Sequence, residues 1–371
     1  MQGCSLTGMS DSYDFAVRRD DMRDTSVIDT PGEDRDIEDG QILLAVDHFS
    51  LTANNVTYGA MGEAMSYWNF YPAEEDSLGR IPAWGYADVI ASKADGIEVG
   101  TRVFGYLPMS THAVLEPGRI RESGFTDITG YRTELPAVYN EYRLVTGEKD
   151  EDRERLVAIF MPLYGTSWLL ADWLNEIDFA GAAQLVASSA SSKTALGLGH
   201  ALQVDFDNPI ETVGLTSPGN LEFTRGTKHW DAVVTYDDLE SLDADTPTIY
   251  VDFGGNAKLR HRIHSHFGDR LLASVAVGIA DWESMVPDDG ESLPGPQPQF
   301  FFAPDRVVKR NADWGQDGLG ERLAKSQDRF TDRSREWMEV RIGAGPDAIR
   351  DSLLELMDGK VPPNEGISVS P

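Results

Sequence analysis

The pattern of apolar and polar positions divides the 371-residue chain into a β-rich first half and a second half in which strands and helices alternate. In the first half the apolar runs at 42–46, 82–90 and 100–106 are short, and turn residues separate them. Many short strands with frequent turns are typical of a small, partly open β-barrel. The charged run 148–155 is the expected boundary, and beyond it apolar residues recur at helical spacing from 164 to 173.

The second half repeats strand and helix regularly. Its clearest helix runs from Asn256 to Phe267, with Leu259 and Ile263 on the apolar face and Gly268 as its stop signal. Repeated alternation of this kind predicts a parallel sheet covered by helices on both faces. The strands are expected at 185–187, 212–216, 231–235, 248–252 and 270–278.

The two ends of the chain are expected to lie outside this α/β region. A proline-rich break, 287–298, precedes a possible strand at 300–302, a helix carrying Leu319 to Trp337, a last helix ended by Gly359 and an edge strand at 367–369. The polar residues 1–38 predict a loosely tied leader or an edge strand. The predicted domains are therefore a leader at 1–38, a β-rich domain at 39–155, an α/β domain at 156–300 and a C-terminal return to the β-rich domain at 301–371.

The stretch 184–216 is the most informative part of the chain. It combines a strand, a turn, a small-residue helix and a second strand, which is the βαβ unit that holds a phosphate at a helix N-terminus. The turn carries serines where glycines are expected, and Ser191 and Ser192 could donate hydroxyl hydrogen bonds. Lys193 adds a positive charge, and Thr194 would lie near the positive end of the helix dipole.

Two other interpretations of this turn stay open. It could be a serine-rich helix cap with an exposed lysine. It could also be a degraded P-loop, although that motif needs glycines where Ala187 and Ser192 stand.

The residues after the later strands predict which dinucleotide would bind. Thr216, Ser217 and Asn220 follow the second strand, and no acid precedes Glu222. A carboxylate here would bind the ribose of NAD, so its absence favours NADP(H), although a simple turn explains the same residues.

Tyr236 follows the third strand, and Gly254 and Gly255 follow the fourth. The two glycines would allow a nicotinamide to approach the backbone. A plain turn with Asn256 as the helix N-cap is the alternative interpretation.

Charge and cysteine content narrow the choice of partners. With 62 acidic and 32 basic residues the net charge is −30, which argues against nucleic acid and anionic membranes as partners. The single cysteine, Cys4, excludes a disulfide framework and a thiolate-rich zinc site. Of His261, His264 and His266 only the first two share a helix face, so no metal is expected. The lack of an 18-residue apolar run and of a signal peptide core predicts a cytoplasmic protein.

The order of a β-rich half, a βαβ half and a C-terminal return resembles the medium-chain dehydrogenase/reductase superfamily, and most closely its zinc-free quinone-oxidoreductase-like branch. Within it, the sequences at 51–59, 188–195 and 214–217 are similar to the DUF2855 family. The resemblance implies a Rossmann-type doubly wound parallel sheet domain together with a GroES-like, partly open β-barrel domain.

The resemblance also implies an activity. It points to a zinc-independent, NADPH-dependent oxidoreductase that transfers hydride to a small quinone, enone or carbonyl substrate in the interdomain cleft. Proteins of this type commonly dimerise, so a homodimer is a further expectation. Tyr58 and Asn55 would border the nicotinamide, and Tyr58 would orient or protonate a substrate oxygen, unless it serves only in packing. The alternative is a catalytically silent NADP(H)-binding sensor or a small-molecule-binding protein of the same fold.

Overall fold

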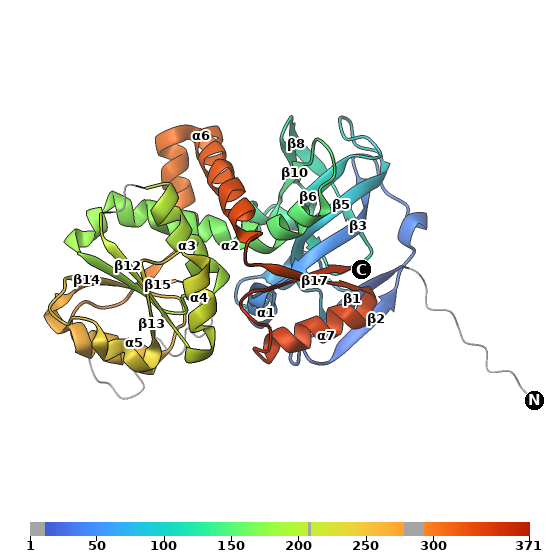
Figure 1. Cartoon of the computed structure of the whole chain (residues 1–371). Coiled ribbons are helices and arrows are strands. Elements are labelled where there is room, and N and C mark those ends of the chain that lie inside the picture. Colours follow the sequence, from blue (N-terminus) through green and yellow to red (C-terminus); the bar gives the residue numbers. More distant parts are fainter. Residues whose placement is uncertain (1–11, 207–208, 278–292) are drawn as a thin grey trace, which may run out of the picture. The chain divides into compact units, whose positions relative to one another are not determined.

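The computed structural model describes residues 12–206, 209–277 and 293–371 (Figure 1). The chain forms two compact units: unit 1 consists of Met1–Ile159 and Val340–Pro371, and unit 2 is Phe160–Glu339. The return to unit 1 therefore comes at residue 340 and not at 301. Residues 1–11 of the predicted leader and the first half of the proline-rich break, 287–292, lie outside the described residues.

Unit 1 is built on a nine-stranded, mainly antiparallel sheet, as the many short apolar runs predict. Its main path is β17-β18-β3-β5-β6-β10-β9-β8, and β7 pairs with β3. The strands are β3 (Ile42–Leu51), β5 (Pro82–Ser92), β6 (Arg102–Pro108), β7 (His112–Leu115), β8 (Pro117–Arg121), β9 (Gly124–Asp127), β10 (Glu141–Leu144), β17 (Glu339–Ala344) and β18 (Glu365–Ser370).

The second sheet of unit 1 begins in the stretch predicted to be a leader. Strand β1 (Tyr13–Arg18) lies between β2 (Thr25–Asp29) and β4 (Leu78–Gly79). Phe15, Ala16 and Val17 are buried in β1, and the Phe15 N–H donates to the Met109 carbonyl. Strand β1 is therefore part of the core and not a loose leader, whereas the largely exposed β2 is an edge strand, the other alternative that the sequence left open.

The boundary between the units lies inside a helix. Helix α2 (Glu151–Glu176) begins within the charged run that predicted a domain boundary, and the units divide between Ile159 and Phe160. Its first turn carries Glu151, Asp152 and Glu154, and acidic groups stabilise a helix N-terminus, so the charges start a helix here and do not form a linker.

Among the described residues α2 is the one helix long and apolar enough to span a membrane. In the structure 67% of its most apolar window is buried, as in the core helix of a globular protein.

Unit 2 contains a six-stranded parallel sheet, which confirms the predicted Rossmann-type domain (Figure 1). Its order β13-β12-β11-β14-β15-β16 places the first strand of the domain at the centre, as in the 3-2-1-4-5-6 dinucleotide-binding sheet. The strands are β11 (Gln184–Ala187), β12 (Glu211–Thr216), β13 (Ala232–Thr235), β14 (Thr248–Asp252), β15 (Leu271–Val277) and β16 (Gln299–Phe301).

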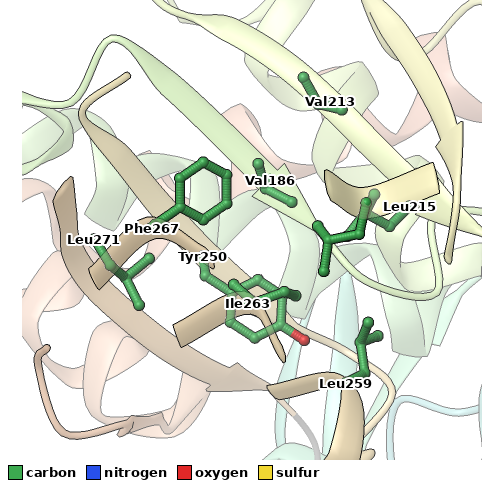
Figure 2. Packing of buried hydrophobic residues seen from close by; sticks show 9 residues of the cluster. Val186, Val213, Leu215, Tyr250, Leu259, Ile263, Phe267 and Leu271 are labelled. Atoms are coloured by element: carbon green, nitrogen blue, oxygen red, sulfur yellow. The ribbon is translucent and has the colours of Figure 1, made fainter. Parts of the chain in front are cut away.

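Helices connect these strands and pack on the sheet. Residues on α5, including Ile263 and Phe267, meet Val186 of β11 and Tyr250 of β14 in one buried cluster (Figure 2). This face of α5 is the one that the apolar spacing predicts. The helices of unit 2 beyond α2 are α3 (Lys193–Val204), α4 (Leu221–Thr227), α5 (Ala257–Phe267) and α6 (Ala303–Ser334).

Helix α6 explains why the chain returns to unit 1 late. Its Phe330 ring lies 4.9 Å from the Phe160 ring, and the Tyr164 hydroxyl lies 2.6 Å from Ser326 Oγ. These contacts hold α6 against α2 in unit 2, where the sequence had assigned it to the return.

After α6, helix α7 (Gly345–Met357) ends before Gly359 as predicted. Strand β18 lies between β17 and β3 and is therefore not an edge strand.

Two histidines are buried in the core of unit 2. His200 of α3 is 5% exposed, His229 is 2% exposed, and their ring centroids lie 5.4 Å apart. Burial lowers the pKa of His200 to about 4 and that of His229 to about 3, with repulsion from Arg333 adding to both shifts. Both imidazoles are therefore neutral in the folded protein.

This pair predicts a loss of stability in mild acid. Below about pH 6.5 both imidazoles bind a proton in the unfolded chain but stay neutral in the folded chain. The free energy of unfolding that depends on these two groups is therefore fully present above pH 6.5 and decreases as pH falls. Each site contributes up to about 1.4 kcal/mol per pH unit. Urea unfolding between pH 7 and pH 5 should show a steeper decline in the wild type than in the double variant His200→Gln/His229→Gln. Equal slopes would contradict the prediction.

Candidate functional site

The candidate site lies at the carboxyl ends of the strands of unit 2. In a doubly wound sheet, ligands bind where the strand order reverses, which here is between β11 and β14. The turn 188–192 follows β11, and the segments after β12, β13 and β14 begin at Ser217, Tyr236 and Phe253. The predicted cofactor residues come from these four segments, from the end of β12 (Thr216) and from the first turn of α3 (Lys193 and Thr194).

The turn after β11 adopts a conformation that usually needs glycine. Ser189 has φ of +48°, in the left-handed region that costs a non-glycine residue roughly 1–3 kcal/mol. Gly254 approaches it closely: a Cβ on Gly254 would lie 2.8 Å from Ser189 Oγ. Ser192 then caps α3, because its Oγ accepts from the Ala195 N–H at 3.3 Å. The turn therefore combines a left-handed residue with a helix cap, and it contains no glycine.

Hydrogen bonds join this turn to the neighbouring strands. The Ser189 N–H donates to Tyr236 Oη at 3.0 Å, which links the turn to the segment after β13. Ser191 Oγ accepts from Thr216 Oγ1 at 3.3 Å and from Asn220 Nδ2 at 3.2 Å, which links the turn to the end of β12. The structure thus brings these predicted residues together.

The link to β14 is a buried network that the sequence did not reveal. Asp252 Oδ1 accepts from Ser188 Oγ at 2.9 Å and from the N–H groups of Gly254 and Gly255 at 3.0 and 2.9 Å. Asp252 Oδ2 forms an ion pair with Arg260 Nε at 3.0 Å, and both side chains are less than 5% exposed. The carboxylate therefore shapes the Gly254–Gly255 segment and ties it to the turn. The only sequence signal was an acid ending a buried strand and an arginine eight residues later.

Burial separates the predicted cofactor residues into two groups. Thr216 is 1% exposed and donates its hydroxyl hydrogen to Ser191, so it supports the turn and does not face a ligand. Ser191 is 8% exposed and accepts two hydrogen bonds, which leaves its own hydroxyl hydrogen to donate. Those with greater exposure are Ser192, Lys193, Thr194, Ser217, Asn220, Tyr236, Gly254 and Gly255.

The end of β12 carries no carboxylate. Ser217 is partly exposed, and Glu222, in the first turn of α4, forms an exposed ion pair with Arg225 at 3.2 Å. Arg225 also donates to the Val233 carbonyl. Arg225 of the same helix thus offsets the charge of Glu222, the first acid after β12. This balance is compatible with a negatively charged ligand group at this position.

The two residues predicted for the substrate serve the fold of unit 1. In helix α1 (Ala53–Ala60), Asn55 Oδ1 accepts from the Thr52 N–H at 2.8 Å, and Asn55 Nδ2 donates to the Pro82 carbonyl at 2.9 Å. The oxygen and the nitrogen of this buried amide are thus both hydrogen-bonded within the protein, and Thr52 and Asn55 form a capping box. These contacts make Asn55 a capping residue of α1.

Tyr58 is 3% exposed, and its Oη accepts from Asn54 Nδ2 at 2.7 Å and Trp84 Nε1 at 3.2 Å. Burial raises its pKa well above the usual range. A proton donor needs the opposite shift. Its ring packs 4.7 Å from Tyr67 and 5.3 Å from Tyr106, so the packing interpretation of Tyr58 is the one that its contacts favour.

One group of potential metal ligands comes together in the described ranges. Ligand atoms of Asp47, His48 and Glu154 lie within 4.8 Å of one another. Arg102 Nη2 lies 2.6 Å from both carboxylates, and Lys149 lies 3.0 Å from Asp47. Side-chain cations thus already neutralise this group, which is an ion-pair network of unit 1.

The three histidines of α5 point to separate partners. His264 contacts the Pro294 carbonyl and Ser274 Oγ, and His266 contacts the Leu242 carbonyl. They do not gather into a metal site.

Solved structures share this architecture at low sequence identity. CurA from Vibrio vulnificus in complex with NADPH is 13% identical with a TM-score of 0.61, covering 96% of this chain and 98% of CurA. The quinone oxidoreductase from Coxiella burnetii is 13% identical with a TM-score of 0.55, covering 97% and 99%. Mycobacterial Rv1454c complexed with NADPH is 12% identical with a TM-score of 0.51, covering 97% and 100%. No curated protein matches the sequence.

The sheet order, the site at its switch point and these likenesses define a protein with the medium-chain dehydrogenase/reductase fold. The chain belongs to the family described as proteins of unknown function, DUF2855, whose model matches residues 49–362. The predicted family and fold class are confirmed.

The buried pair at the site predicts a strong coupling. Asp252→Asn or Arg260→Met alone leaves one buried charge without its partner and should cost about 3 kcal/mol of unfolding free energy. The double variant should lose clearly less than the sum of the two single losses, as measured by urea unfolding. Glu240→Gln, which breaks the exposed ion pair with Arg262, is the control and should change stability little. Additive losses would contradict the coupling.

Proposed function

We propose that this protein is an NADP(H)-dependent oxidoreductase that needs no zinc and transfers hydride to a small quinone, enone or carbonyl compound. The observation that carries the proposal is the convergence of four segments at the switch point of a 3-2-1-4-5-6 sheet, joined by the hydrogen bonds of Ser188, Ser189 and Ser191. Two structures of the same fold, CurA and Rv1454c, are NADPH complexes, which supports the choice of cofactor.

The pyrophosphate of the cofactor would lie against the start of α3. Ser191 keeps a hydroxyl hydrogen to donate, Ser192 and Thr194 are partly exposed, and Lys193 is the first residue of the helix. The positive end of the helix dipole and the lysine charge would both favour an anion in a chain of net charge −30.

The adenosine and nicotinamide ends would use the neighbouring segments. Ser217 and Asn220 would face the 2′-phosphate, where no carboxylate repels it. Tyr236, Gly254 and Gly255 would lie along the nicotinamide side, with the two glycines held in place by Asp252. The cofactor supplies the hydride, and these residues bind and orient it.

A catalytically silent NADP(H)-binding protein is the second candidate. Three observations favour it. The Ser189 N–H already donates to Tyr236, Asn55 caps helix α1, and the pKa of Tyr58 is raised. None of these residues supplies a ready proton donor for the acceptor oxygen. A fold can persist after its chemistry is lost.

The first test is NADPH binding, followed by tryptophan quenching and by cofactor fluorescence. The wild type should bind NADPH saturably, and Lys193→Ala should raise the Kd about tenfold, which corresponds to about 1.4 kcal/mol. Lys360→Ala removes the same charge from an exposed site in unit 1 and should leave the Kd unchanged.

The same samples separate the two candidates when NADPH oxidation is followed with a panel of quinones and enones. Turnover supports the oxidoreductase, whereas saturable binding without turnover of any compound supports the silent binding protein. If neither NADPH nor NADH binds, both candidates are wrong.

A second test addresses the choice between the two dinucleotides. Ser217→Asp places a carboxylate after β12, where it should repel the 2′-phosphate and accept from a ribose hydroxyl. The ratio of the Kd for NADPH to that for NADH should therefore rise at least tenfold. Ser217→Asn, which has nearly the same shape without the charge, should keep the wild-type ratio. An unchanged ratio in Ser217→Asp would mean that the 2′-phosphate does not lie there.

A further inference from the structure

Unit 2 has a second pocket, of about 390 Å³, on helices α2 and α6. Its wall also includes Asp205 and Phe206, which follow the C-terminal end of α3, whereas the candidate cofactor turn precedes the N-terminus of that helix. A helix of 12 residues is about 18 Å long, so the two places are separate. The size falls within the range of small-molecule sites.

The wall of this pocket is cationic in a strongly acidic protein. It carries four basic side chains and two carboxylates, against a net charge of −30 for the whole chain. The carboxylates are engaged: Asp172 lies 2.6 Å from Arg310, and Asp205 forms an ion pair with Arg329.

The other two cations, Arg322 and Lys325, form no ion pair within the part of the chain that the structure describes. They stand three residues apart on α6, a spacing at which like charges destabilise a helix. A bound anion would relieve that repulsion.

Aromatic rings form the rest of the wall. The Trp168 ring lies 5.7 Å from Phe206 and 6.3 Å from Trp314. The guanidinium groups of Arg310 and Arg322 lie 4.6 and 4.7 Å from the centre of the Trp314 ring. These contacts place cationic and aromatic groups side by side in the wall, which therefore offers partners both for an aromatic ring and for a carboxylate.

The kink in α6 makes this arrangement possible. Gly315 has φ of +77°, in the left-handed region, and interrupts the helix between Trp314 and Arg322. Residues on either side of the kink, Arg310 before it and Lys325 after it, therefore contribute to one pocket.

We propose that this pocket binds a small planar aromatic carboxylate. The carboxylate would pair with Arg322 and Lys325, and the ring would pack among the aromatic side chains of the wall. The site is independent of the proposed cofactor site and does not require that the protein be an oxidoreductase.

The test uses 2-naphthoate as the probe, with binding measured by isothermal titration calorimetry on the full chain. Two analogues separate the parts of the recognition: 2-naphthamide keeps the ring and lacks the charge, and cyclohexanecarboxylate keeps the charge and lacks the ring. The wild type should bind 2-naphthoate saturably, and each analogue should bind at least tenfold more weakly.

Variants then locate the site. Arg322→Gln/Lys325→Gln should weaken 2-naphthoate at least tenfold, and Trp314→Leu should also weaken it. The control Arg350→Gln/Lys360→Gln removes two exposed cations in unit 1 and should bind as the wild type does. Lys193→Ala should likewise leave 2-naphthoate binding unchanged, which distinguishes this pocket from the cofactor turn. Absence of binding at millimolar probe, equal binding of the amide, or an unaffected Arg322/Lys325 variant would each overturn the proposal.

Discussion

The candidate site depends on one buried charge. Asp252 ends the strand next to the centre of the sheet, and taking a carboxylate out of water costs several kcal/mol unless it is paired and hydrogen-bonded. Arg260, Ser188 and two backbone N–H groups meet that requirement. Because these partners come from the turn after β11, the segment after β14 and helix α5, satisfying the charge holds three separate segments in one geometry.

Serines occupy the positions in the turn after β11 where glycine is usual. Ser189 accepts a left-handed backbone, and the hydrogen bonds of Ser188 and Ser191 go to neighbouring strands. A glycine turn has a free backbone and no side-chain links, whereas this turn is bound to β12 and β14 through serine hydroxyls and to the segment after β13 through the Tyr236 hydroxyl. It is thus less adaptable than a glycine turn, and a cofactor must fit a geometry that is already set.

The long-range effect of the net charge differs from the local effect of individual cations in this protein. The overall excess of acid keeps polyanions away at long range. At short range, Lys193 at the start of α3 and the cations on α6 place positive charge at two sites on this otherwise acidic protein. Both lie in unit 2, and in each of them side-chain hydroxyls or aromatic rings accompany the charge. Net charge therefore argues against polyanionic partners but not against small anions.

The sequence by itself determined the parallel sheet of unit 2, although it assigned α6 to the C-terminal return. Apolar runs of strand length and the helical spacing of α5 predicted the parallel sheet, because burial on both faces of a sheet leaves a continuous apolar signal. The same pattern located the turn at Ser188–Ser192 and the absence of an acid after β12. These are local properties, which a sequence records directly.

Only the tertiary structure decided what each polar residue does. In the sequence Asn55 and Thr216 are candidates for ligand binding. In the structure their side chains form hydrogen bonds with Thr52 and Ser191, which stabilise the fold. The pairing of Asp252 with Arg260 and the pocket around Trp314 join residues from different elements. Hydrogen bonds and burial depend on which segments meet in space, and a pattern along the chain does not contain that information.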